Sequence, residues 1–161
     1  MNLRNAFLVI AVTVTGCAGP AVKNMPSPIG RYSPPTVTAE TAAITGSISR
    51  LMLTRTRARI EVVDGYAVRE IQEADQPPVA VSAGRRILVV ACETDPFTAY
   101  DRSDIAVDIL ANHQYSLSCK SDNLWSHGGS IFSIVDTTDK NKEVATAFGP
   151  GRAFSPRGRR F

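Results

Sequence analysis

The sequence predicts an all-β protein, a small β-sandwich of about eight short strands. Between Thr41 and Ala147, short runs rich in β-branched residues are separated by turn residues, and helical periodicity is nearly absent. Several runs also alternate apolar and polar positions with a period of two. With 161 residues and a net charge of +3, the chain fits one domain and has no charge excess typical of a nucleic-acid binder.

The expected strands follow one another at short intervals through this region. They cover residues 41–47, 54–63, 67–71, 79–82, 86–93, 105–110, 115–120, 131–136 and 143–147. The pair Asp64-Gly65 predicts a tight hairpin turn, because both residue types tolerate a positive φ. The stretch Ser82-Ala83-Gly84 predicts a second turn, from the strand at 79–82 into the next one.

Alternation within the strands assigns side chains to a core face. In the strand at 105–110, the isoleucine and valine positions point one way and the intervening positions point the other. Two further strands each place two apolar residues and a cysteine on one face. The predicted core positions are Ile105, Val107, Ile109, Leu88, Val90, Cys92, Tyr115, Leu117 and Cys119, with Phe132 packing against the same core.

The amino terminus predicts an export signal over residues 1–16. Arg4 supplies a positive charge, residues 6–14 form an apolar run, and small residues follow it. The stretch Val14-Thr15-Gly16-Cys17 resembles a lipobox, the signal of bacterial lipoproteins. The resemblance implies cleavage before Cys17, lipidation of Cys17 with palmitate and other acyl chains, and, because Ala18 follows, a periplasm-facing anchor in the cell outer membrane.

Residues 17–40 are expected to form a tether between this anchor and the folded domain. Five prolines between Ala18 and Pro35 disfavour helix and sheet pairing, so Tyr32 is expected to be exposed. The domain is predicted to cover residues 41–148. Residues 149–161 carry four arginines and no acid among several glycines and prolines, which predicts a disordered basic tail able to touch anionic lipid or lipopolysaccharide.

Within the domain, the motif order resembles that of uncharacterised lipoproteins with a PEGA-like or transthyretin-like β-sandwich. The resemblance rests on Ala43-Ile44-Thr45-Gly46, Val63-Asp64-Gly65, residues 83–90 and residues 111–117. Its motifs are short and consist mostly of turns and strands. It therefore implies a fold and carries no catalytic residue over to this chain.

Cys92 and Cys119 are predicted to form a disulfide. An exported chain meets oxidising conditions, and no other cysteine remains once Cys17 is acylated. Their strands could pair as a hairpin, which would place both sulfurs in one core layer. Two reduced core cysteines are the alternative.

Neither histidine has a partner at metal-ligand spacing, so no metal site and no cofactor are expected. A hydrolase would have to use the loop from Ser126 to Ser130, with His127 or His113 as its base. The chain lacks a Gly-x-Ser-x-Gly elbow, and adjacent Ser126 and His127 would point to opposite faces of an extended segment. A glycine-rich connecting loop is the simpler interpretation.

Arg55, Arg57 and Arg59 place three guanidinium groups on one side of a predicted strand. This stripe could bind phosphate or carboxylate groups of the envelope. The favoured alternative is a solvated face that protects an edge strand from aggregation.

These observations lead to the expectation of a non-enzymatic, lipid-anchored envelope protein that binds or supports another envelope component. The expected partners are the membrane, through the lipid, and an envelope protein or anionic envelope polymer. Nucleic acid is not expected as a partner of an exported chain. The alternatives are the small hydrolase and an electrostatic binder of anionic polymer that uses the arginine stripe and the tail.

Overall fold

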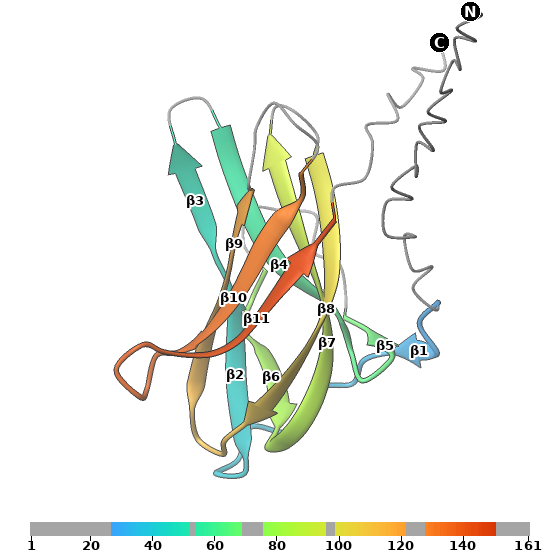
Figure 1. The fold of residues 1–161 in the computed structure, drawn as a ribbon. Coiled ribbons are helices and arrows are strands. Elements are labelled where there is room, and N and C mark those ends of the chain that lie inside the picture. Colours follow the sequence, from blue (N-terminus) through green and yellow to red (C-terminus); the bar gives the residue numbers. More distant parts are fainter. Residues whose placement is uncertain (1–26, 52–53, 69–75, 96–98, 122–127, 151–161) are drawn as a thin grey trace, which may run out of the picture.

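The computed structural model shows two β-sheets packed face to face (Figure 1). The structure describes residues 27–51, 54–68, 76–95, 99–121 and 128–150. Every regular element in these ranges is a strand, so the predicted all-β sandwich is confirmed. None of these residues belongs to a helix long and apolar enough to cross a membrane.

One sheet has six strands and contains the longest hairpin of the fold. Its order is β1 (Gly30–Arg31), β5 (Tyr66–Ala67), β4 (Thr54–Val63), β7 (Gly84–Asp95) and β8 (Ala99–Ile109), and β3 (Ile48–Leu51) pairs with the other end of β4. All pairs in it are antiparallel except the short pair of β1 with β5. β4 is therefore an interior strand, with β7 on one side and β3 and β5 on the other.

The other sheet has five strands, in the order β11 (Lys142–Gly149), β10 (Ser130–Asp136), β9 (Gln114–Ser121), β2 (Thr41–Gly46) and β6 (Val79–Ser82). β2 runs parallel to β9, and the remaining pairs are antiparallel. Beyond Gly46 the chain passes from this sheet into β3 of the six-stranded sheet. A Cβ atom at Gly46 would lie 2.2 Å from the carbonyl oxygen of Ala58, so only glycine allows the two backbones to approach this closely.

The core lies between the sheets and includes the positions that alternation predicted, together with residues of β2, β4 and β6. Ile105, Val107 and Ile109 are buried, whereas Asp104 and Asp108 on the opposite face of β8 are exposed. The other predicted core residues are also buried, except Cys119, which is partly buried against the core. Alternation predicted these faces correctly because each strand has one face on the core and one face on the solvent.

The predicted disulfide is present, and it joins the two sheets. Cys92 on β7 and Cys119 on β9 are bonded, with their Cα atoms 6.0 Å apart. The two strands face each other across the core and do not pair as a hairpin, because β7 pairs with β4 and β8 and β9 pairs with β10 and β2. The bond therefore fastens one layer of the sandwich to the other.

The predicted turn at Asp64 and Gly65 is also present, with φ values of 49° and 86°. It connects β4 to β5. The turn that ends at Gly84, which has a φ of 110°, carries the chain from β6 in one sheet to β7 in the other. The two turns were predicted by the same reasoning, but only the first closes a hairpin.

Several expectations are wrong. The tether was expected to disfavour sheet pairing, but Gly30–Arg31 within it form β1, which pairs with β5. Tyr32 is docked, because its ring packs against the core and its hydroxyl donates to the carbonyl oxygen of Ala80. The segment from Ile48 to Leu51 forms β3, and β8 begins at Ala99, six residues before the predicted strand. The strand with the arginine stripe is not an edge strand, since β4 pairs on both sides.

Candidate anion-binding pocket

The outer face of the six-stranded sheet, which is the face turned away from the five-stranded sheet, carries a charged cluster. Arg57 and Arg59 point to this face because Ala58, between them, and Ile60, after Arg59, point into the core. Pairing of β4 with β7 shifts register between Ile60 and Val62, so Glu61 is an extra residue in the strand. This bulge leaves both Glu61 and Val62 beside Arg59 on the outer face, whereas strict alternation would bury Val62 in the core.

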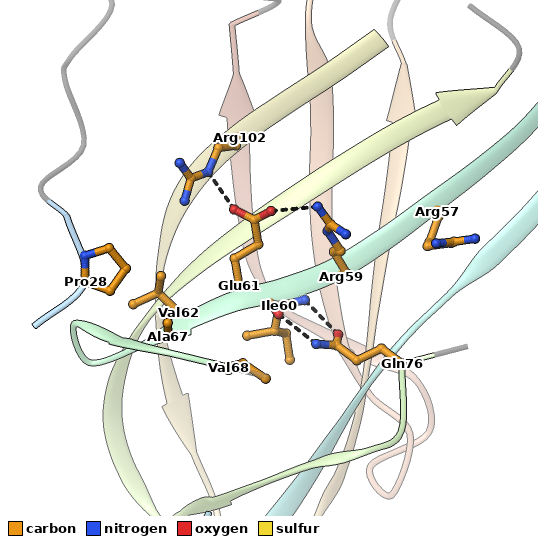
Figure 2. A pocket seen from close by; sticks show the side chains of 10 residues that line it. All are labelled: Pro28, Arg57, Arg59, Ile60, Glu61, Val62, Ala67, Val68, Gln76 and Arg102. Carbon is orange, nitrogen blue, oxygen red and sulfur yellow. Dashed lines mark hydrogen bonds and ion pairs between the residues drawn. The ribbon is translucent and has the colours of Figure 1, made fainter. Parts of the chain in front are cut away.

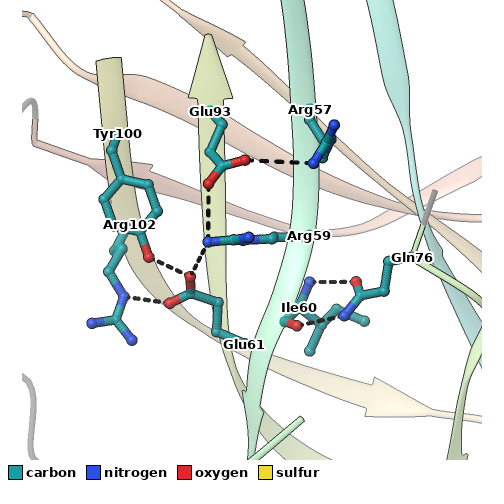
Figure 3. Close-up of polar contacts among 8 residues, drawn as sticks. All are labelled: Arg57, Arg59, Ile60, Glu61, Gln76, Glu93, Tyr100 and Arg102. Atoms are coloured by element: carbon teal, nitrogen blue, oxygen red, sulfur yellow. Dashed lines mark hydrogen bonds and ion pairs between the residues drawn. The ribbon is translucent and has the colours of Figure 1, made fainter. Parts of the chain in front are cut away.

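A small residue on the neighbouring strand lets the charged side chains meet. Ala91 of β7 pairs with Arg59 of β4 on one side and with Arg102 of β8 on the other. Ala91 is fully buried, but it does not belong to the core between the sheets. It is therefore covered by the longer side chains around it on the outer face. The side chains of Arg59, from β4, and Arg102, from β8, can therefore meet at a shared carboxylate over β7 (Figure 3).

That shared carboxylate belongs to Glu61. Its Oε2 lies 2.7 Å from Nε of Arg102, and its Oε1 lies 3.0 Å from a terminal nitrogen of Arg59. The hydroxyl of Tyr100 donates to the same Oε1. We call Glu61, Arg59, Arg102 and Tyr100, with Glu93 and Arg57, the Glu61 cluster. The side chains of Arg59 and Glu61 are each only 17% exposed, so these charges are screened less than charges on an open surface.

The pKa values of the cluster reflect this setting. Burial, together with the hydrogen bond and the negative charge of Glu61, raises the pKa of Tyr100 to about 12. Burial opposes the charge on Arg59, but Glu93, Tyr100 and Glu61 together hold the pKa of Arg59 above its usual range. The guanidinium of Arg59 also lies over the ring of Tyr100, 5.8 Å from its centre.

Glu93 links the second arginine of the stripe to the cluster. Its carboxylate lies 3.0 Å from Arg59 and 3.8 Å from Arg57. Because its 3.8 Å contact is longer than the 3.0 Å contacts of Arg59 and the 2.7 Å contact of Arg102, Arg57 is held more weakly than either, although it belongs to the same cluster.

The backbone next to these side chains has a gap in its strand pairing. β3 pairs with β4 as far as Arg57, and β5 pairs with it from Val62 onward. Between them, the side-chain amide of Gln76 accepts a hydrogen bond from the backbone nitrogen of Ile60 and donates one to its carbonyl oxygen, at 2.9 and 2.7 Å. The carboxamide of Gln76 thus satisfies β4 where a neighbouring strand is missing.

A pocket of about 240 Å³ opens over this gap (Figure 2). Charged and amide groups and aliphatic groups both line it. In Figure 2, Arg102, Arg59 and Arg57 lie along the upper and right side, and Pro28, Val62, Ala67 and Val68 lie to the left and below. The lining residues are Arg57, Arg59, Glu61, Arg102 and Gln76, and Pro28, Ile60, Val62, Ala67 and Val68. We call this site the arginine pocket. It combines a cationic end, suited to a carboxylate or phosphate, with an apolar wall.

The arginine stripe is only partly used by this pocket. Arg57 and Arg59 line it, whereas Arg55 lies farther along β4, opposite Asp95 of β7. The interpretation as a simply solvated face is wrong for Arg57 and Arg59, whose side chains are 19% and 17% exposed and bridged by Glu93.

The residues of the proposed hydrolase do not converge. Ser130 is 1% exposed and donates its hydroxyl to Asp101. His113 pairs with Asp136, at the opposite end of the seven-residue strand β10, roughly 20 Å from Ser130. Ser126 and His127 lie outside the described residues, as do Cys17 and residues 151–161 of the tail.

The pair of His113 and Asp136 forms a second charged cluster. Nδ1 of His113 lies 2.6 Å from Oδ2 of Asp136, and Oδ1 of Asp136 accepts hydrogen bonds from the backbone nitrogens of Thr138 and Asp139. Burial would raise the pKa of Asp136, but these hydrogen bonds together hold it below its ordinary value. We call these groups the Asp136 cluster.

Several residues of the site could not be assigned from the sequence. Tyr100 and Arg102 precede the strand predicted at 105–110, and Glu93 and Gln76 carried no signal of their own. Glu61 did carry one, because it continues the alternation of Arg55, Arg57 and Arg59 within a correctly predicted strand. Among the described residues, no group of three or more His, Cys, Asp or Glu side chains could hold a metal ion.

Comparisons of the chain with known protein families, with curated proteins and with solved structures found no match.

Proposed function

We propose that this chain is a lipid-anchored, non-enzymatic binding module of the cell envelope, and that it binds an anionic group of another envelope component in the arginine pocket. One observation carries the proposal. The guanidinium groups of Arg57, Arg59 and Arg102 line one small pocket, where they contact the carboxylates of Glu61 and Glu93.

The partial burial and the net charge of the cluster both favour the binding of an anion. Partly buried guanidinium groups have already lost much of their hydration, so they lose little more when an anion binds. The cluster retains one more positive than negative charge, which attracts an anion over several ångströms.

The lipid anchor is the second part of the proposal, and it is supported by the lipobox-like stretch that ends at Cys17. Export would bring the pocket into the compartment of its proposed partner, and the disulfide between Cys92 and Cys119 is compatible with an oxidising compartment. Replacement of Cys17 with Ser should release the protein from membranes and abolish labelling with a fatty-acid analogue. Membrane retention with undiminished labelling would contradict the anchor.

Photo-crosslinking in intact cells tests the binding function. A photoreactive amino acid at Val68, in the pocket wall, should form a crosslink with an envelope component, which mass spectrometry then identifies. The same group at Lys120, on β9 of the other sheet, serves as the control. The crosslink at Val68 should disappear when Arg59 and Arg102 are replaced with Gln. Crosslinks that are equal at both positions, or unaffected by the loss of the arginines, would contradict the proposal.

A further inference from the structure

We infer that the arginine pocket binds a single carboxylate attached to an apolar, residue-sized group, as found at the end of a protein chain or on an acidic residue beside an apolar one. This inference rests on the proposed function and narrows its ligand to a protein segment, as opposed to a phosphate-rich polymer.

The size of the pocket is the first argument. Pockets for cofactors and drug-sized ligands measure roughly 300 to 1,000 Å³. The arginine pocket, at about 240 Å³, is smaller and accommodates a group of about one residue. The rest of a larger partner would have to remain outside.

Its lining is the second argument. Val62 and Val68 lie across the pocket from the arginines and offer no hydrogen bond to a second polar group. The bulge at Glu61 is the reason that Val62 faces this way. A ligand that carries charge at every end would leave part of that charge against an aliphatic wall, which is unfavourable. A carboxylate on an apolar stem satisfies both ends of the pocket.

The balance of charge is the third argument. Glu61 and Glu93 already neutralise most of the charge of the three arginines. A phosphate dianion would place two negative charges next to the carboxylate of Glu61, whereas a monoanion would place one. The carboxylate of Glu61, held by Arg59, Arg102 and Tyr100, shows that these donors have a geometry that suits a carboxylate.

Arg57 is the residue expected to receive the ligand. Its contact with Glu93 is long, at 3.8 Å, and Glu93 lies closer to Arg59. An incoming carboxylate could bind the two terminal nitrogens of Arg57 in the bidentate manner typical of arginine, next to the carboxylate of Glu61.

The test uses the full chain, purified in a nonionic detergent, and three small-molecule probes. Titration calorimetry at pH 7 compares N-acetyl-leucine, which has one carboxylate and one apolar side chain, with N-acetyl-leucinamide and with inorganic phosphate. We expect N-acetyl-leucine to bind at least about tenfold more tightly than either of the others.

Arg57→Gln should weaken the binding of N-acetyl-leucine by about tenfold or more. Arg50→Gln removes the same charge from an exposed position on β3, outside the pocket, and should leave the affinity unchanged. If Arg57→Gln does not fold, Arg57→Lys serves in its place and should also weaken binding, because lysine cannot donate two parallel hydrogen bonds.

The outcomes separate the two proposals. Binding of phosphate as tightly as N-acetyl-leucine would overturn the inference and leave the anion-binding function in place. Equal affinity for the carboxylate and its amide, or an affinity unchanged in the Arg57 variants, would also overturn the inference. A failure of both anions to bind would contradict the proposed function as well.

Discussion

The two charged clusters of this protein each contain a partly or fully buried carboxylate, but they are built in opposite ways. Asp136 receives its hydrogen bonds from His113 and from the backbone of the turn that follows it, all at one end of the β9 and β10 pair. Glu61 receives its contacts from side chains on β4 and β8 and lies beside a pocket.

This difference indicates what each carboxylate does. Backbone amides cannot leave a folded turn, so Asp136 is satisfied permanently and stabilises the turn. Arginine side chains can rearrange around a second anion, so the Glu61 cluster can exchange or share its partners.

The largest change in stability should come from loss of the disulfide, because it joins the two sheets that carry both clusters. Replacing both Cys92 and Cys119 with Ala should lower the free energy of unfolding by about 3 to 4 kcal/mol, because the bond closes a loop with a sequence separation of 27. Urea denaturation measures this change. Reduction of the wild-type disulfide should reproduce it, and an unchanged unfolding midpoint would contradict a stabilising bond between the sheets.

Asp136→Asn should lower the free energy of unfolding by about 1 to 3 kcal/mol at pH 7, because the side chain is 2% exposed and its hydrogen bonds are strengthened by charge. The folded pKa of Asp136 is depressed below 3.8, so its ionised form contributes stability above pH 3.8. This contribution is lost as the pH falls from 3.8 through the folded pKa. The difference between variant and wild type should therefore narrow in acid.

Asp139→Asn provides the matched control for this pH dependence. Asp139 is exposed in the same turn and donates only its backbone nitrogen to Asp136. Its variant should follow the wild-type curve of unfolding free energy against pH. A gap between Asp136→Asn and wild type that stays constant down to pH 2 would argue against the ionised hydrogen bonds as the source of the stability.

Glu61→Gln should lower the free energy of unfolding by about 1 to 2 kcal/mol, because Arg59 and Arg102 lose a mostly buried charged partner. Its effect on binding should have the opposite sign. Removal of the internal carboxylate should tighten binding of N-acetyl-leucine by about tenfold at low salt. Glu40→Gln, at an exposed position outside the pocket, is the control. Weaker binding in Glu61→Gln would contradict competition between Glu61 and the ligand.

The smallest effect concerns the titration of Tyr100. Its pKa of about 12 in the wild type should fall toward 10.0 in Glu61→Gln, because the variant removes a negative charge and a charged acceptor. Ultraviolet absorbance during alkaline titration measures it, and Tyr100→Phe identifies the signal. Since the folded pKa is raised, Tyr100 also lowers stability as the pH rises from 10 to 12. An unchanged titration curve in Glu61→Gln would remove Glu61 as the cause.

The sequence allowed the core faces and the first turn to be predicted, because both depend on neighbouring residues. Leu88, Val90 and Cys92 alternate along one strand, and Asp64 and Gly65 favour a turn by their own conformational preferences. The pairing of strands depends on residues far apart in the chain. The parallel pair of β2 and β9 and the passage from β6 to the other sheet were therefore not predicted.

The residues of the site also divide into those that neighbouring residues predict and those that depend on strand pairing. The common face of Arg57 and Arg59 was predicted from their spacing. Glu93, which contacts both, and Arg102, which contacts Glu61, come from other strands, whose register no local pattern shows. The bulge at Glu61, which turns Val62 toward the pocket, also depends on pairing with β7. Likewise, Gln76 binds the backbone of Ile60 between the parts of β4 that pair with β3 and β5, a position defined only in the assembled sheet.

The central claim is that the Glu61 cluster is open to an anion whereas the Asp136 cluster is closed. A nuclear magnetic resonance titration of the full chain with sodium acetate, at constant ionic strength, tests it most directly. The Nε–H signals of Arg57, Arg59 and Arg102 should shift and saturate together, while the ring signals of His113 should not move. Shifts of similar size at Arg50, shifts at His113, or an absence of shifts at the three pocket arginines would contradict the claim.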